Sequence, residues 1–157
     1  MTVLEAIQRG TEFLGKKGVD TPRLQVELLL AHLLALPRMK LYLNFERALV
    51  PAETDALREL LVRRGQREPL QHLVGTVSFC GLELAVSRHV LVPRPETELL
   101  AEAAWQWLAA RGAGASALDL GTGSGCLAIA LATHCPAARV VASDVSPGTL
   151  ISPLTAS

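Results

Sequence analysis

Apolar residues recur at helical spacing through the first part of the chain, in a pattern that predicts three helices. Val3, Ile7 and Leu14 mark the first helix. A second helix is expected to begin at Thr21-Pro22, an N-cap followed by proline at the first helical position, and to end before Pro37. The residues expected to face inward are Leu24, Leu28, Ala31 and Leu34 in the second helix, and Leu57, Leu60 and Leu61 in a third helix that begins at Pro51.

The period of the pattern changes to two in the middle of the chain. Val77 and Phe79 alternate with polar neighbours, Gly81 interrupts the run, and Leu82 and Leu84 alternate again, which predicts a β-hairpin. The prolines that follow exclude a helix interior. A helical stripe is expected directly after them, made of Leu99, Leu100, Ala103, Ala104 and Trp107.

The last part of the chain predicts strands that alternate with a helix. Ser116-Ala117-Leu118 is typical of a short buried strand, residues 126–132 of a helix, and Arg139–Ser143 of a second strand parallel to the first. Strand, turn, helix and parallel strand together form an α/β unit. Two parallel strands leave part of their surface uncovered, so we expect an open edge at residues 138–143.

A glycine-rich turn, Asp119-Leu120-Gly121-Thr122-Gly123-Ser124-Gly125, lies between the first strand and the helix. In such units the backbone N–H groups of the turn and the helix N-terminus face a ligand. A dinucleotide fingerprint would place its third glycine where Cys126 stands, and a P-loop would need a lysine, so the spacing excludes both. An acidic residue at the strand end repels a pyrophosphate and favours a ligand that carries an ammonium group.

A second carboxylate, Asp144, ends the second strand and follows Gly121 by 23 residues. A Rossmann-type site holds the ribose hydroxyls with an acidic residue at about this distance from its glycine turn. An ordinary turn or cap residue before Ser146-Pro147 is the alternative for Asp144 taken alone. Asp119 and the three glycines in register favour the ligand interpretation.

Composition adds few constraints. The 157 residues contain 15 Lys and Arg against 15 Asp and Glu, so no overall charge favours nucleic acid or an anionic membrane. No apolar run approaches the ~18 residues of a membrane span, and the N-terminus lacks the features of a signal peptide. Cys80, Cys126 and Cys135 have no metal-ligand spacing. We therefore expect reduced thiols in a cytoplasmic protein that holds no metal.

The sequence does not assign a definite role to two groups of polar residues. Arginines crowd the third helix and its end, where a solvated helix face is the simpler interpretation and a partner-binding patch is the alternative. The histidines are scattered, and we assign none of them as a general base. The arginines are Arg58, Arg63, Arg64 and Arg67, and the histidines are His72, His89 and His134.

Three segments together resemble the HemK/PrmC family of protein-glutamine methyltransferases: Leu91–Glu98, Asp119–Cys126 and Asp144–Pro147. Arg67–His72 and Phe79–Gly81 add to the likeness, which covers roughly residues 1–150. The first segment, with its Pro-Arg-Pro-Glu-Thr-Glu run, makes the resemblance specific, because the glycine loop alone would fit many S-adenosylmethionine-dependent methyltransferases.

The resemblance implies an α/β protein in three parts. These are a helical release-factor-binding domain at residues 1–72, a β-hairpin linker at 73–91, and the first part of a Rossmann-like methyltransferase domain at 92–157. The implied activity uses S-adenosyl-L-methionine to methylate the glutamine side-chain amide in the Gly-Gly-Gln motif of peptide chain release factors.

The resemblance also implies a cofactor site. Asp119 and the glycine loop would seat the methionine end, and Asp144 would hold the ribose. The loop residues are Gly121, Thr122, Gly123, Ser124 and Gly125, and Arg94 and Thr97 are further candidates for the wall of the cofactor pocket.

The sequence departs from the family where the target amide is recognised. The family holds the glutamine amide with an Asn-Pro-Pro-Tyr motif, whereas the asparagine of this sequence is Asn44, in the helical part. Residues 151–157 also do not resemble the family. We therefore assign no catalytic residue and expect an altered or truncated ending, with the 157 residues inactive as they stand.

Three functions consequently remain open. The first is release factor glutamine methylation, and the second is a non-catalytic chain that only binds the release factor. The third, methylation of another amide or of an exocyclic amine such as adenine in DNA, is disfavoured by the neutral charge. In each case we expect a monomer without membrane contact, and no direct binding of nucleic acid in the first two.

Overall fold

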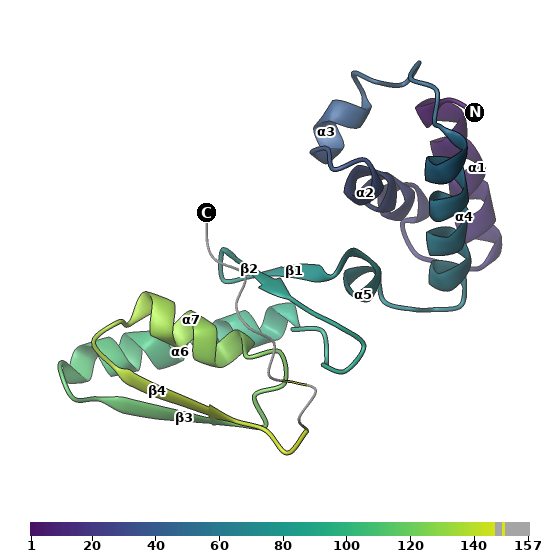
Figure 1. Cartoon of the computed structure of the whole chain (residues 1–157). Coiled ribbons are helices and arrows are strands. Elements are labelled where there is room, and N and C mark those ends of the chain that lie inside the picture. The colour runs from purple at the N-terminus through teal and green to yellow at the C-terminus, as the bar shows by residue number, and fades with distance from the viewer. Residues whose placement is uncertain (147–148, 150–157) are drawn as a thin grey trace. The chain divides into compact units, whose positions relative to one another are not determined.

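A computed structural model describes residues 1–146 and residue 149, and in it the chain forms two compact units (Figure 1). The first unit is Met1–Val74 and the second begins at Gly75. The expected altered ending at residues 151–157 lies outside the described residues. The expected three-part division at residues 72 and 91 stays a prediction.

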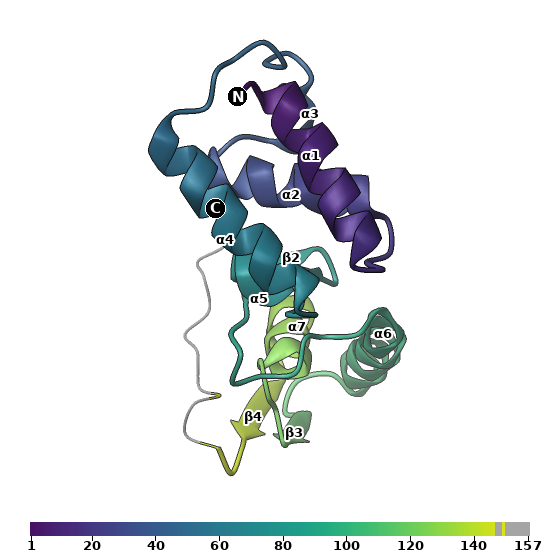
Figure 2. The same ribbon diagram turned by 90° about the vertical axis from the view of Figure 1, so that its right-hand side faces the viewer.

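The first unit is entirely helical apart from an isolated bridge between Thr2 and Ala48. Figures 1 and 2 show α1, α2 and α4 packed against one another. The shorter helices α3 and α5 each contact α2. The helices of this unit are α1 (Val3–Lys16), α2 (Pro22–Leu33), α3 (Arg38–Leu41), α4 (Pro51–Gly65) and α5 (Leu70–Val74).

Local sequence signals set where these helices begin. Thr2 caps α1 by accepting a hydrogen bond from the Glu5 N–H, and the Glu5 carboxylate accepts one from the Thr2 N–H in return. Thr21 is the residue before α2, as expected, but it adopts a left-handed conformation (φ 46°) and its side chain makes no capping bond. Proline at the first position of α2 therefore marks this helix start more than the threonine does.

The face that α2 buries matches the expected one only in part, because Ala31 is buried as expected. Leu24 is exposed, and the fully buried residues are Val26, Leu29 and Leu30. Apolar residues surround most of this helix, so their spacing alone does not select a face. The α2 residues pack into a core with residues from α1 and α4, including Val3, Ala6, Ile7, Leu14 and Leu57.

Glu27 is a charged residue inside this unit, with 1% of its side chain exposed. Its carboxylate accepts hydrogen bonds from Arg23 Nε at 3.0 Å, Arg38 Nε at 2.8 Å and the Tyr42 hydroxyl at 2.9 Å. Burial by itself raises the pKa of Glu27, and the hydrogen bonds from these three residues outweigh it, so the pKa lies below its usual value. We call these four residues the Glu27 cluster. It ties α2 to α3 and to Tyr42, which follows α3 directly.

The second unit combines a hairpin with a parallel strand pair. The hairpin turns at Cys80 and Gly81, which both have positive φ, as a type I′ turn requires. Figure 1 shows α6 and α7 on the same side of β3 and β4. The elements are β1 (Thr76–Phe79), β2 (Leu82–Ala85), α6 (Pro95–Arg111), β3 (Ser116–Leu120), α7 (Cys126–His134) and β4 (Arg139–Ser143).

Two small cores hold this unit together. The hairpin contributes Phe79 and Leu84 to a cluster with Ala101 and Ala130 of the two helices. A second cluster joins α6 and α7 to the inward faces of β3 and β4 and contains Leu108, Leu131, Cys135, Ala117 and Val140. The expected stripe of α6 is wrong for its large residues, because Leu99, Leu100 and Trp107 are exposed.

The expectation of a buried first strand is also wrong. Leu118 and Leu120 of β3 are exposed, while Ala117 points to the covered face. β3 and β4 form a parallel two-stranded sheet, and the described residues place no further strand beside either of them. Helices cover this strand pair on one face, so the large apolar residues of β3 on the other face are exposed.

Two further properties concern the described residues, 1–146 and 149. None of the helices there has both the length and the hydropathy that crossing a bilayer requires. The same residues contain no group of His, Cys, Asp and Glu side chains that could hold a metal ion. All the cysteines, Cys80, Cys126 and Cys135, are free.

The helical core generates a stability prediction. Leu30→Ala removes a side chain without exposed surface and should lower the free energy of unfolding by about 2–5 kcal/mol. Leu43→Ala is the matched control, because Leu43 is 84% exposed and its truncation should change stability little. Urea denaturation followed by circular dichroism measures both, and equal effects would contradict the assigned core.

The Glu27 cluster generates a pH prediction. Glu27→Gln removes the charged acceptor of three donors and should lower the free energy of unfolding at pH 7 by about 1–3 kcal/mol. Because folding lowers the pKa of Glu27, its contribution is complete above the unfolded pKa of about 4.3 and disappears as the pH falls through the folded value.

Denaturation of both proteins at several pH values measures this difference. The stability gap between the unaltered chain and Glu27→Gln should shrink as the pH falls below 4. Glu46→Gln, at an exposed carboxylate, is the control and should show no such gap at any pH. A gap for Glu27→Gln that is constant from pH 7 to pH 3 would contradict the role of the charge.

Candidate functional site

The candidate site lies at the carboxyl ends of β3 and β4. The parallel register pairs Asp119 with Ala142 and Leu120 with Ser143, so the glycine loop after β3 and Asp144 after β4 leave the sheet at the same edge. In open α/β sheets, ligands bind outside the carboxyl ends of the strands. The structure thus brings Asp144 to the loop, where Asp144 and Gly123 hydrogen-bond.

Glycine is required in this loop by its backbone conformation. Gly121, Gly123 and Gly125 have φ of 72°, 56° and 77°, in the left-handed region that residues with a side chain rarely adopt. A Cβ at Gly121 would meet no atom within 4 Å, and one at Gly123 would approach only the Gly121 carbonyl, at 4.0 Å. The space beside these two residues is therefore not filled by described protein atoms.

Four N–H groups of the loop, those of Gly121, Thr122, Gly123 and Gly125, have acceptors within the chain. Gly121 and Thr122 both donate to the Ser143 carbonyl, at 2.8 and 3.1 Å, and Gly125 donates to the Thr122 carbonyl at 2.8 Å. The Gly123 N–H donates to an Asp144 carboxylate oxygen at 2.9 Å. Gly121 and Gly123 therefore offer a ligand open space, because they have no side chain, and not a free N–H group.

Asp119 is half-buried at the end of β3 and is held in place by the loop. One of its carboxylate oxygens accepts a hydrogen bond from the Thr122 hydroxyl at 2.7 Å. Thr122 and Ser124 are themselves buried. A carboxylate can accept about four hydrogen bonds, so Asp119 keeps acceptor capacity for a cationic or hydroxyl-bearing ligand.

Asp144 combines the two roles that its sequence position suggests. One oxygen accepts the Ser146 N–H at 2.8 Å, which forms an Asx turn, and the other accepts the Gly123 N–H across the loop. These backbone hydrogen bonds, from Ser146 first and Gly123 next, lower the pKa of Asp144 below its usual value. The side chain is therefore an anion at neutral pH, and it fixes the loop against the end of β4.

Cys126 begins α7 directly after the loop. Burial raises the pKa of its thiol, which outweighs the opposing hydrogen bond with Ser124. Because the thiolate is the reactive form of cysteine, a raised pKa makes this residue a poor nucleophile. The structure gives Cys126 a packing role beside the loop.

Arg94 and Thr97 lie at the start of α6. Arg94 is the exposed N-cap residue of this helix, and its carbonyl accepts the Thr97 N–H at 2.9 Å. Within the described part of the chain, no hydrogen bond or ion pair joins either residue to the glycine loop. Their assignment to a cofactor pocket stays a prediction.

Other residues near the hairpin and the loop were missed from the sequence. The Ser143 carbonyl holds the loop, and the Glu98 carboxylate accepts the Cys80 N–H at 3.0 Å at the hairpin turn. His134 stacks on Trp105 with ring centroids 4.2 Å apart. Each contact joins residues far apart in the sequence, and a backbone acceptor such as Ser143 leaves no signal in residue type.

The arginines on and after α4 have intramolecular partners, which supports the interpretation as a solvated helix face. Arg58 bonds to Asp55, and Arg63 makes two hydrogen bonds to the Glu68 carboxylate at 2.6 and 2.8 Å. Arg64 donates to Gln25 and to the Glu68 carbonyl, and Arg67 donates to the Lys17 carbonyl. Arg64 thus joins the end of α4 to α2, and Arg67 joins the segment after α4 to the end of α1.

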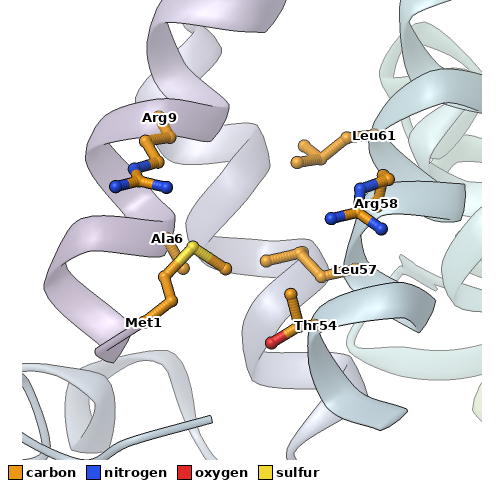
Figure 3. Close-up of a pocket in the computed structure, with 7 residues that line it drawn as sticks. All are labelled: Met1, Ala6, Arg9, Thr54, Leu57, Arg58 and Leu61. Carbon is orange, nitrogen blue, oxygen red and sulfur yellow. The ribbon is translucent and has the colours of Figure 1, made fainter. Parts of the chain in front are cut away.

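A shallow hollow of about 180 Å³ lies between α1 and α4 (Figure 3). Ala6, Leu57 and Leu61 line it, and Arg9 and Arg58 stand on its opposite sides. No buried polar side chain lines this hollow. It offers a small apolar depression whose polar lining residues are Arg9, Thr54 and Arg58.

Comparisons with known proteins agree on a family. Residues 5–75 match the family model described as the PrmC N-terminal domain. The chain is 44% identical to a release factor glutamine methyltransferase of Geobacter sulfurreducens, over 95% of this chain and 51% of the relative. It is 46% identical to the protein of that name from Chlorobaculum tepidum, over 95% of this chain and 52% of the relative.

A third relative, the release factor glutamine methyltransferase of Mycolicibacterium smegmatis, is 45% identical over 92% of this chain and 50% of its own length. The chain thus spans about half the length of the curated relatives it matches. The matches include both the helical unit and the glycine loop with its two carboxylates, because they cover more than nine tenths of the chain. Over more than nine tenths of its length the chain is thus similar to proteins of the release factor glutamine methyltransferase family, and residues 5–75 match the PrmC N-terminal domain.

Proposed function

We propose that this chain serves the methylation of the glutamine side-chain amide in the Gly-Gly-Gln motif of peptide chain release factors. The observation that carries the proposal is the pair of carboxylates, Asp119 and Asp144, beside a side-chain-free loop at the ends of two parallel strands. Relatives that are 44% and 46% identical to this chain carry the name release factor glutamine methyltransferase, which supports the proposal.

The residues present fit S-adenosyl-L-methionine as the cofactor. Its ammonium group needs an anion, which Asp119 provides, and its ribose needs hydroxyl acceptors, which Asp144 provides. The open space beside Gly121 and Gly123 would admit the ligand close to the backbone. When bound, this cofactor supplies an activated methyl group on a sulfonium that leaves readily.

Further residues of the loop and of α6 complete the proposed site. Thr122 holds the Asp119 carboxylate through its hydroxyl, and buried Ser124 supports the turn. Gly125 allows the turn to enter α7, because its φ is positive. Arg94 and Thr97 would form part of the pocket wall. Such a site acts mainly by orientation, since a good leaving group needs little acid or base help.

A second candidate function is binding of the release factor without methyl transfer. The observation that favours it is that Met1–Val74 forms a compact unit of its own, separate from the glycine loop. The helical unit, with its own core, would then bind the partner. Methylation of adenine or of another amine receives no support from the neutral charge.

The same proposal covers the setting of the protein. We place it in the cytoplasm, where release factors act and where its free cysteines stay reduced. We propose a monomer whose partner is a release factor, without a membrane and without direct contact to nucleic acid.

The two candidate functions predict different outcomes of one assay. A protein of residues 1–157 alone should not transfer radiolabelled methyl to a Gly-Gly-Gln release factor above a blank without enzyme. A fusion of residues 1–146 to the C-terminal half of the Geobacter sulfurreducens relative should transfer it. Transfer by residues 1–157 alone would contradict the need for further residues, and an inactive but folded fusion would favour binding alone.

The glycine loop can be tested within the same fusion. Gly123→Val places a β-branched side chain at φ 56° in the open space beside the loop, and it should lower methyl transfer at least about a hundredfold. Gly114→Val is the control, because Gly114 also has positive φ and open space around it but precedes β3 at the opposite end of the strand. Equal loss in both variants would indicate backbone strain and not a cofactor site.

A further inference from the structure

The Glu27 cluster lines an open hollow of about 300 Å³ on the helical unit. Arg23, Arg38 and Tyr42 stand in its wall, together with Thr21, Pro22 and Leu24. Glu27 is buried, whereas the side chains of Arg23 and Arg38 are 60% and 42% exposed. The hollow therefore has a fixed charged base and two cationic groups that solvent reaches.

The charges of the hollow do not balance. Two guanidinium groups face one carboxylate, so the lining residues carry one positive charge in excess. Each guanidinium bonds to Glu27 through its Nε, and the Tyr42 hydroxyl is a further polar neighbour of both arginines. A guanidinium has five N–H donors in a planar fork, and its terminal edge can hold a second carboxylate with two parallel bonds.

The Glu27 carboxylate holds both guanidinium groups in place before any ligand binds. Arg38 Nε and Arg23 Nε bind its two different oxygens, and the Tyr42 hydroxyl adds a third bond. Two arginines anchored in this way lose less side-chain freedom on binding than free surface arginines do. The arrangement is that of a preformed anion clamp.

The surroundings of the clamp favour a protein over a free anion. Leu24, which is 37% exposed, lines the hollow. Met39 and Leu43, which are 71% and 84% exposed, directly follow Arg38 and Tyr42 in the sequence. Arginine and tyrosine with apolar neighbours are the residue types that dominate binding energy in protein interfaces. Inorganic phosphate or a nucleic acid backbone would make no use of these side chains.

We propose that the Glu27 hollow receives a glutamate or aspartate side chain of a protein partner, flanked by apolar residues of that partner. The partner carboxylate bonds to the terminal edges of Arg23 and Arg38, and its neighbours pack on Leu24, Met39 and Leu43. This inference does not rest on the proposed function, because it concerns the helical unit and holds whether or not a methyl group is transferred.

Side-chain NMR of the 157-residue chain tests the proposal, through the Nε–Hε signals of Arg23 and Arg38. The probes are acetyl-Leu-Glu-Leu-amide, its glutamine counterpart acetyl-Leu-Gln-Leu-amide, and inorganic phosphate at equal ionic strength. The glutamate peptide should shift both signals in a saturable way and bind about tenfold more tightly than the glutamine peptide. Phosphate should neither reproduce the shifts nor displace the peptide.

Equal binding of the two peptides would overturn the proposal, because the carboxylate would then contribute nothing. Displacement of the peptide by phosphate would also overturn it, because the hollow would then hold any anion. These comparisons use the unaltered chain and do not depend on how a variant folds.

A pair of variants then locates the site. Arg23→Gln leaves Glu27 bonded to Arg38 and Tyr42, and it should weaken the glutamate peptide about tenfold. Arg58→Gln removes an exposed arginine of α4 and should leave peptide binding unchanged. Equal weakening by both variants would show a general effect of charge and would refute the clamp.

Discussion

The parallel pairing of β3 with β4 is the constraint on which the candidate site depends. It brings the Ser143 carbonyl under the glycine loop, where that carbonyl accepts two N–H groups, and it brings the Asp144 carboxylate to a third. Without β4 the loop would have three unsatisfied donors and no fixed path. The positions of both carboxylates therefore follow from the register of two short strands and not from the loop sequence alone.

The two units of the chain achieve their packing by different means. The helical unit has a core of large aliphatic residues and encloses one ionised side chain, Glu27, which three donors satisfy. The second unit combines a few large residues with alanines: Ala101 and Ala130 belong to the cluster beneath the hairpin, and Ala117 packs against the cluster of the two helices. Alanine lets helices and strands approach closely but buries little apolar surface, so each contact there contributes less than a buried leucine.

Sequence reasoning succeeded where chain order decides the outcome and failed where distant partners decide it. The sequence could place the helix starts at Pro22 and Pro51, the glycine loop and Asp144, because each of these features depends on nearby residues. The inward face of α2 could be predicted only in part, since that helix has apolar residues around most of its surface. The burial of Glu27 could not be predicted from the sequence. Charged residues are rarely buried unless paired, and its partner Arg38 lies 11 residues away.

The Glu27 cluster has a consequence for how the sequence can evolve. One carboxylate serves Arg23, Arg38 and Tyr42, so losing any one donor leaves the carboxylate partly satisfied, whereas losing the carboxylate removes the shared partner of all three. Single replacements of a donor are thus tolerable intermediates, and replacement of Glu27 is tolerable only after the donors have changed. The four positions are expected to vary as a set among descendants of this chain, with Glu27 the last to change.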